Sequence, residues 1–215
     1  MVIENIHRDA GTVKVTRKLT DWDAELPESI LQNQQKLCDR RLFFSQITSI
    51  ATTAALLPVI VHAGADRVNT SFLEQQPWKT FAAVQEHLFP AGKNSPGARD
   101  INATLYLKNT LDTPDMEKED RDFILNGVKW LDAMSNEMKG KPFINLQAKG
   151  REIVLRHIEK SSAGENWLAT IILYITEALL ADPVYGGNPG GIGWKWLQHQ
   201  PGFPRPPEDK MYYKL

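Results

Sequence analysis

The stretch Trp167-Leu-Ala-Thr-Ile-Ile-Leu-Tyr-Ile-Thr-Glu-Ala-Leu-Leu180 is strongly apolar, and it decides the fold class. Apolar residues fall on most faces of a helix built from it, which is typical of a helix buried at the centre of a domain. With Gly164 separating it from the segment before, the run is about 14 residues long. That length is well short of the roughly 20 apolar residues that a membrane-spanning helix needs. The sequence therefore predicts a buried central helix.

Two shorter helices are predicted earlier in the chain. Pro77 suits the first turn of a helix, and the apolar residues that follow it have helical spacing: Trp78, Phe81, Val84 and Leu88. A loop rich in proline and glycine, residues 90–97, ends this helix. A short helix from about Asp100 follows, with Ile101, Leu105 and Tyr106 on one side.

Two further helices complete the predicted bundle. Residues 112–115, Asp-Thr-Pro-Asp, supply a cap and a proline for a long helix that ends at about Lys139, before Gly140 and Pro142. Its inward residues are Ile124, Val128, Leu131, Met134 and Met138. Asn145 is predicted to cap the next helix, through Lys160, with Ile153, Val154 and Ile158 facing inward. No alternating strand pattern follows Ala63, so residues 64–215 are predicted to form one all-α domain, a compact helical bundle.

The whole-chain composition excludes several kinds of site. A formal net charge of -1 over 215 residues gives no electrostatic excess for holding nucleic acid or an anionic bilayer. Cys38 is the only cysteine. Disulfides, cysteine-ligated zinc, iron–sulfur centres and thioether-linked haem are therefore not expected in the chain that follows it.

The N-terminal third has the pattern of an export signal. Arg40-Arg41 is followed by Phe43, by the uncharged segment 47–61 and by Val61-His-Ala63, an order that resembles a twin-arginine signal. Residues 1–63 are predicted to be the leader, with cleavage after Ala63. Asp39, where Ser or Thr is common, and the long extension before it depart from the usual pattern. The alternative is that residues 47–61 form a core helix of a cytoplasmic protein.

A loop rich in glycine and aromatic residues follows the central helix. It runs Asp182-Pro-Val-Tyr-Gly-Gly-Asn-Pro-Gly-Gly-Ile-Gly-Trp-Lys-Trp196, and Pro201-Gly-Phe-Pro204 comes soon after. Its glycines do not have the Gly-x-Gly-x-x-Gly spacing of a dinucleotide site. Tyr185, Trp194 and Trp196 are suited to anchoring the loop by burying their rings. The loop then either closes the C-terminal end of the domain or is presented to a partner subunit.

This loop resembles a signature near the C-terminus of the gluconate 2-dehydrogenase subunit 3 family. The resemblance extends over about residues 72–205, and its matching loop residues are Asp182, Tyr185, Gly186, Gly187, Asn188, Gly193 and Trp194. It implies the small, non-catalytic subunit of an exported sugar or sugar-acid dehydrogenase. In such a complex FAD belongs to the large subunit, and haem c belongs to a cytochrome subunit that is often present; this chain binds neither. The resemblance further implies export with the folded flavoprotein by the twin-arginine translocase to the periplasm, with attachment to the inner membrane through the partner subunits.

The rival hypothesis is that this chain is itself catalytic. Its candidate acid–base groups are His87, His157, His199, Glu177 and Asp182, and none has a partner at a diagnostic spacing. His157 is predicted to lie at the surface. Glu177, within the apolar run, is predicted to hydrogen-bond a neighbouring helix or loop, and Asp182 to accept hydrogen bonds from amides of the glycine loop. A free-standing periplasmic binding protein is a third interpretation.

Overall fold

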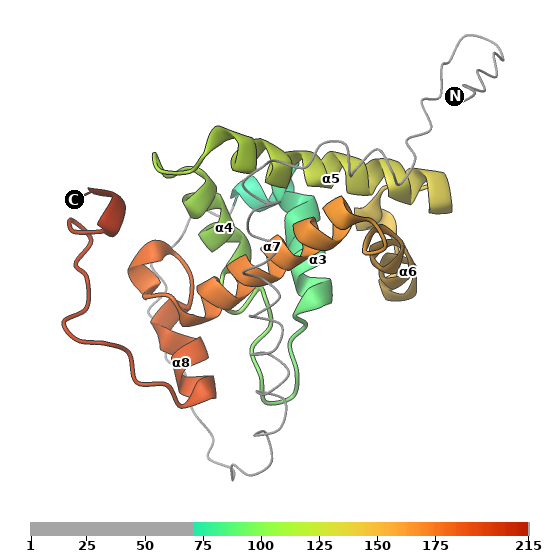
Figure 1. The fold of residues 1–215 in the computed structure, drawn as a ribbon. Helices are drawn as coiled ribbons and strands as arrows, with labels where there is room; N and C mark the ends of the chain where they lie inside the picture. The colour runs from blue at the N-terminus through green and yellow to red at the C-terminus, as the bar shows by residue number, and fades with distance from the viewer. Residues whose placement is uncertain (1–70, 215) are drawn as a thin grey trace, which may run out of the picture.

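The computed structural model describes residues 71–214, and it confirms the all-α prediction for them (Figure 1). They form no strand, and their α helices are α3 (Trp78–Leu88), α4 (Ala103–Leu111), α5 (Lys118–Lys139), α6 (Ala148–Ile158), α7 (Ser162–Leu180) and α8 (Ile192–Leu197). Short 3-10 helices lie between them: η1 (Ser71–Glu74), η2 (Phe143–Asn145), η3 (Pro183–Tyr185), η4 (Pro189–Gly191) and η5 (Tyr212–Lys214). The predicted leader, with Arg40, Arg41, Phe43 and the cleavage site after Ala63, lies outside the described residues.

Helix α7 is the central helix, as its apolar sequence predicts. It packs against α3, α4, α5 and α8 (Figure 1). The side chains of Trp167, Ile171 and Ala178 on its inner face are fully buried. The indole nitrogen of Trp167 donates a hydrogen bond to the Ile124 carbonyl of α5 at 3.0 Å. Gly127 allows helices α5 and α7 to approach closely here, because a Cβ at this position would overlap that indole ring.

The central helix begins earlier than its apolar run. The Ser161 side chain accepts a hydrogen bond from the Gly164 amide at 3.0 Å, so Ser161 is the N-cap. Gly164 therefore lies in the first turn of α7 and does not separate two helices. A Cβ at this position would overlap the Ile158 carbonyl of α6, which explains why glycine is present.

The predicted start of the long helix was wrong, although its end was right. Helix α5 begins at Lys118 and ends before Gly140, whose φ is +67°. Residues 112 and 113 finish α4 instead: the Asp112 amide donates to the Lys108 carbonyl, and the Thr113 hydroxyl donates to the Thr110 carbonyl at 2.8 Å. Asp112 and Thr113 therefore form the end of α4, and they do not cap the start of α5.

Helix α6 is shorter than predicted at both ends. Asn145 belongs to η2, and the N-cap is Gln147; the helix stops at Ile158 because Ser161 caps α7. Ile153 is 40% exposed, so its predicted inward position was wrong, while Leu155 is in the core. Helix α4 likewise begins at Ala103 rather than Asp100 and buries Leu107 and Leu111, whereas Leu105 is only partly buried.

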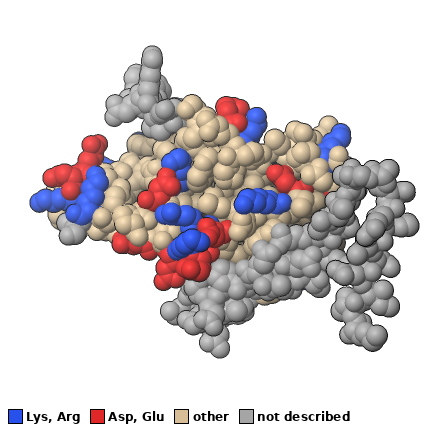
Figure 2. Space-filling view, turned by 90° about the horizontal axis from the view of Figure 1, so that it is seen from above, with Lys and Arg blue, Asp and Glu red and all other residues tan. Residues whose placement is uncertain are grey.

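The outer surface around α5 is strongly charged. Figure 2, a view from the side on which α5 lies in Figure 1, shows basic and acidic side chains intermixed over this face. Lys118 and Asp122, one turn apart on α5, form an ion pair at 2.6 Å. Within residues 71–214 no helix combines the length and apolarity that crossing a membrane requires.

Candidate functional site: the loop that caps the central helix

Asp182 starts the glycine- and aromatic-rich loop by capping η3. Its Oδ1 accepts a hydrogen bond from the Val184 amide at 3.1 Å, so a loop amide does bind this carboxylate as predicted, but the amide is not one of a glycine. Arg205, in the C-terminal tail, donates to both carboxylate oxygens at 2.7 and 3.0 Å. These hydrogen bonds from Arg205 are the main cause that lowers the pKa of Asp182. The carboxylate is therefore held ionised in a fixed orientation.

Asn188 joins three parts of the fold. Its side chain is fully buried, and its φ of +50° is in the left-handed region that Asn tolerates better than most residues. The amide nitrogen Nδ2 donates to the Ala181 carbonyl at 3.0 Å, and Oδ1 accepts from the Gly193 amide at 2.7 Å. The Asn188 backbone amide donates to the Ile101 carbonyl at 3.0 Å. The residue thereby fixes the end of α7, the start of α8 and the turn before α4.

Two glycines let the loop lie directly on the last turn of α7. A Cβ at Gly187 would be 2.8 Å from the Ala178 carbonyl oxygen, and one at Gly193 would overlap the Leu179 carbonyl. These two positions need glycine because the backbone of the loop lies close to the backbone of α7. The many glycines of the loop are consistent with such a close approach.

The aromatic residues anchor the loop on its neighbours. Trp194 is 8% exposed, and its indole nitrogen donates to the Leu180 carbonyl at 2.7 Å. The Arg205 guanidinium lies 5.3 Å from the centre of the Trp194 ring. The Tyr185 carbonyl accepts a hydrogen bond from Asn109 of α4 at 3.2 Å. The Tyr185 ring contacts the Tyr212 ring, with the two ring centroids 5.7 Å apart. Trp196, by contrast, is 40% exposed, although its ring lies beside that of Phe89.

Side chains of the loop satisfy two carbonyls at the C-terminal end of α7. The last carbonyls of a helix have no partner within the helix. Here Trp194 binds the Leu180 carbonyl and Asn188 binds the Ala181 carbonyl. The sequence does not reveal these two roles, because both residues bond to groups that only the folded chain brings near.

The predicted acid–base candidates lie in separate places. Glu177 is partly buried and accepts a hydrogen bond from the Tyr106 hydroxyl of α4 at 3.3 Å, which confirms the prediction of a bond to a neighbouring helix. Burial and the Glu177 carboxylate together raise the pKa of Tyr106. His199, after α8, is exposed, and His157 on α6 is partly buried rather than fully at the surface. Among residues 71–214 no group of three His, Cys, Asp or Glu side chains is arranged to hold a metal ion.

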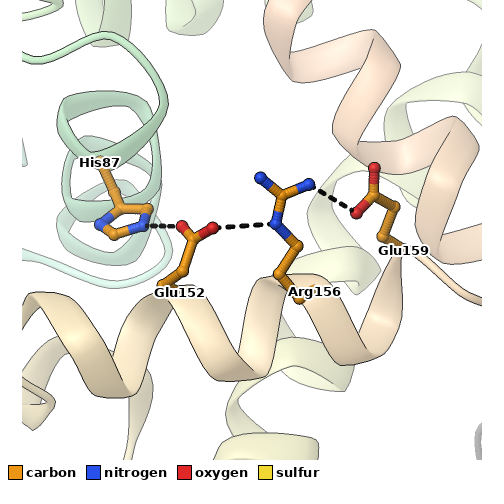
Figure 3. A network of polar contacts seen from close by, with 4 residues as sticks. All are labelled: His87, Glu152, Arg156 and Glu159. Carbon is orange, nitrogen blue, oxygen red and sulfur yellow. Dashed lines mark hydrogen bonds and ion pairs between the residues drawn. The ribbon is translucent and has the colours of Figure 1, made fainter.

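His87 takes part in a polar network at the surface (Figure 3). Its Nε2 lies 2.8 Å from Oε2 of Glu152 on α6, whose other oxygen accepts from Arg156 at 2.8 Å. Arg156 also binds Glu159 at 3.2 Å. The hydrogen bonds from His87, first, and from Arg156 lower the pKa of Glu152. The network joins α3 to α6 and gives His87 a structural partner.

Comparison with known proteins identifies one family. The model of a family described as Gluconate 2-dehydrogenase subunit 3 matches residues 75–202, well over half of the chain. This range includes α3 to α8 and the whole loop from Asp182 to Trp196. Neither a curated protein nor a solved structure matches the chain significantly.

Proposed function

The chain belongs to the gluconate 2-dehydrogenase subunit 3 family, and we propose from this that it is the non-catalytic small subunit of a periplasmic, FAD-dependent sugar or sugar-acid dehydrogenase. The observation that carries the proposal is the extent of the family match, which takes in the helical core and the loop that caps α7. Membership of the family implies a dehydrogenase partner.

In this proposal the chemistry belongs to the partner subunits. FAD and the sugar pocket are in the large subunit, and haem c is in the cytochrome subunit where one is present. The contacts of the titratable groups in this chain support the division. Asp182 is paired with Arg205, Glu177 with Tyr106 and His87 with Glu152. Each pair links two segments of the fold, which is a structural use of these groups.

The small subunit would also direct export. Arg40-Arg41, Phe43 and the uncharged segment 47–61 resemble a twin-arginine signal, a route associated with proteins that fold before they cross the membrane. A flavoprotein without its own signal would cross while bound to this subunit. The complex would then lie in the periplasm, attached to the inner membrane through its partner subunits.

The export role is tested with the full chain co-expressed with the flavoprotein subunit. We expect that Arg40→Lys with Arg41→Lys removes dye-linked dehydrogenase activity from the periplasmic fraction and leaves it in the cytoplasm. Arg17→Lys, which leaves the arginine pair intact, is the matched control. Undiminished periplasmic activity in the double variant would refute the escort role.

The division of chemistry has its own test. The full chain, expressed and purified without the large subunit, is expected to carry no flavin absorbance and to reduce no dye in the presence of sugars or sugar acids. Co-purifying flavin would show that this chain binds the cofactor itself.

A further inference from the structure

Between Ala169 and Leu180, the face of α7 that points away from the core carries no charged residue; Glu165, one turn before Ala169, is the acidic residue at the N-terminal end of this face. The side chains of the uncharged part lie within one stripe about 100° wide when placed at 100° per residue, and they are Ala169, Ile172, Leu173, Thr176 and Leu180. We call this set the outer stripe. Ile172 and Leu180 are 44% and 43% exposed, and the other three are partly exposed. Residues 71–214 thus leave an apolar helix face partly uncovered, and such faces commonly mark interaction sites.

Other helices of the domain have charged outer faces. On α6, Glu152 pairs with Arg156, and Arg156 also pairs with Glu159 at the C-cap of the helix (Figure 3). On α5, Lys118 pairs with Asp122, and Figure 2 shows basic and acidic side chains intermixed on the side of the domain where α5 lies. These helices have the polar exterior of a helix that stays in water. The outer stripe of α7 has the composition of a surface that loses its water.

The polar groups at the outer stripe already have partners within the chain. The hydroxyl of Thr176, its one polar side chain, donates to the Ile172 carbonyl at 2.9 Å. At its C-terminal end the Leu180 carbonyl accepts from Trp194 and the Ala181 carbonyl accepts from Asn188. A neighbouring surface could therefore cover the stripe without leaving these groups buried and unpaired.

We infer that the outer stripe of α7 is the apolar centre of the surface that binds the large dehydrogenase subunit, through an uncharged apolar patch on that subunit. The inference rests on the proposed function, which supplies a lasting partner. Lasting subunit interfaces have apolar centres from which charged residues are depleted. A charged partner surface would have to give up its water opposite Ile172 and Leu180 and would gain no counter-charge from this stripe.

The size of the stripe fits the centre of an interface rather than the whole of it. From Ala169 to Leu180 the helix rises about 17 Å, and with a width of about 10 Å the stripe presents roughly 170 Å². A stable interface buries about 800 Å² on each partner. Helix α8 packs against α7, and its Trp196 and Leu197, which are 40% and 42% exposed, would supply part of the remaining area. The remainder would be a polar rim.

The glycine- and aromatic-rich loop then has an indirect part in binding. Its residues Asn188, Gly193 and Trp194 are buried and hold α8 on the end of α7. They position the contact surface and satisfy the helix end beneath it.

The surface is tested by co-purifying the large subunit with the tagged full chain. Ile172→Lys is expected to lower the recovered flavoprotein at least about tenfold, because a lysine there would be buried without a counter-charge. Ile153→Lys is the matched control, since Ile153 is 40% exposed on the charged helix α6; it is expected to bind as well as the unmodified chain. Equal recovery with both variants would overturn the inference. If the unmodified chain recovers no flavoprotein, the proposed function itself fails.

A labelling experiment tests the same surface and does not require that a lysine variant folds. In a Cys38→Ser background the chain has no other cysteine, so Ile172→Cys and Ile153→Cys each introduce a single thiol. Maleimide labelling at position 172 is expected to be fast in the isolated chain and to slow at least about tenfold in the complex, as for a site buried by a partner, while position 153 stays reactive in both. Equal labelling at position 172 in both states overturns the inference. So does protection already present in the isolated chain, which would mean that its own leader or a second copy covers the stripe.

Discussion

Replacing Asn188 by alanine tests whether this one side chain holds the end of α7 and the start of α8 together. The substitution removes the donor to the Ala181 carbonyl, which is partly buried, and the acceptor of the Gly193 amide, which is buried. Each unsatisfied buried group costs about 1–3 kcal/mol. Alanine at a φ of +50° adds about 1 kcal/mol. The expected loss in the free energy of unfolding is therefore about 3–7 kcal/mol, a large part of the 5–15 kcal/mol typical of a whole protein.

Asn102 offers a matched control for the backbone part of this loss. Its φ is +54°, also in the left-handed region, but its side chain makes no capping hydrogen bond in α4. Asn102→Ala should therefore cost only about 1 kcal/mol. Subtracting the two losses leaves the contribution of the two side-chain hydrogen bonds, about 2–6 kcal/mol.

The assay is urea unfolding of the full chain at neutral pH, followed by tryptophan fluorescence and by far-ultraviolet circular dichroism. Trp194, one of the six tryptophans, belongs to the same loop and donates to the Leu180 carbonyl at the end of α7, so it contributes a signal from this region. If Asn188→Ala and Asn102→Ala lower the unfolding free energy equally, within about 0.5 kcal/mol, Asn188 does not hold the loop and the argument is wrong.

Two further predictions concern the core and the surface. Gly127→Ala would gain about 1 kcal/mol from helix propensity, but its Cβ would overlap the Trp167 indole, so we expect a net loss of about 1–3 kcal/mol in urea unfolding; a more stable variant would show that α5 and α7 separate without cost. The lowered pKa of Glu152 means that its share of stability is present above pH 4.5 and is lost as the pH falls below that value. His87→Ala, which removes the main cause of the lowered pKa, should weaken the acid dependence of the thermal midpoint below pH 4.5, and an unchanged dependence would contradict the role of the His87 hydrogen bond.

The sequence predicts well those parts of the fold that depend on regularly spaced apolar residues or on a single glycine at a helix end. The central helix and the end of α5 at Gly140 follow from apolar periodicity and from a glycine in the left-handed region. The start of α5 could not be predicted in the same way. Asp112 and Thr113 can serve either the end of one helix or the start of the next, and the contacts of α4 decide between them.

The choice of inward residues in α6 failed for a similar reason. Three apolar residues in a row, from Ile153 to Leu155, leave the buried face undetermined by the pattern alone. Helix α6 packs against α5 and α3, and in this packing Leu155 lies in the core and Ile153 at the surface. Local spacing predicts that a helix exists, but its rotation depends on the segments packed against it.

The central helix shows what an apolar sequence can and cannot decide. Apolar residues on most faces of α7 predicted that all of it is buried within the domain. The structure buries the inner face with Trp167 and Ile171, but it leaves Ile172 and Leu180 more than 40% exposed. Residues 71–214 therefore bury only part of the apolar surface that this helix provides. In a member of a family of dehydrogenase subunits, the unused part is best explained by a partner. On this argument the same 14-residue run has two functions, since its inner face forms the core of the domain and its outer face binds the subunit that carries the chemistry.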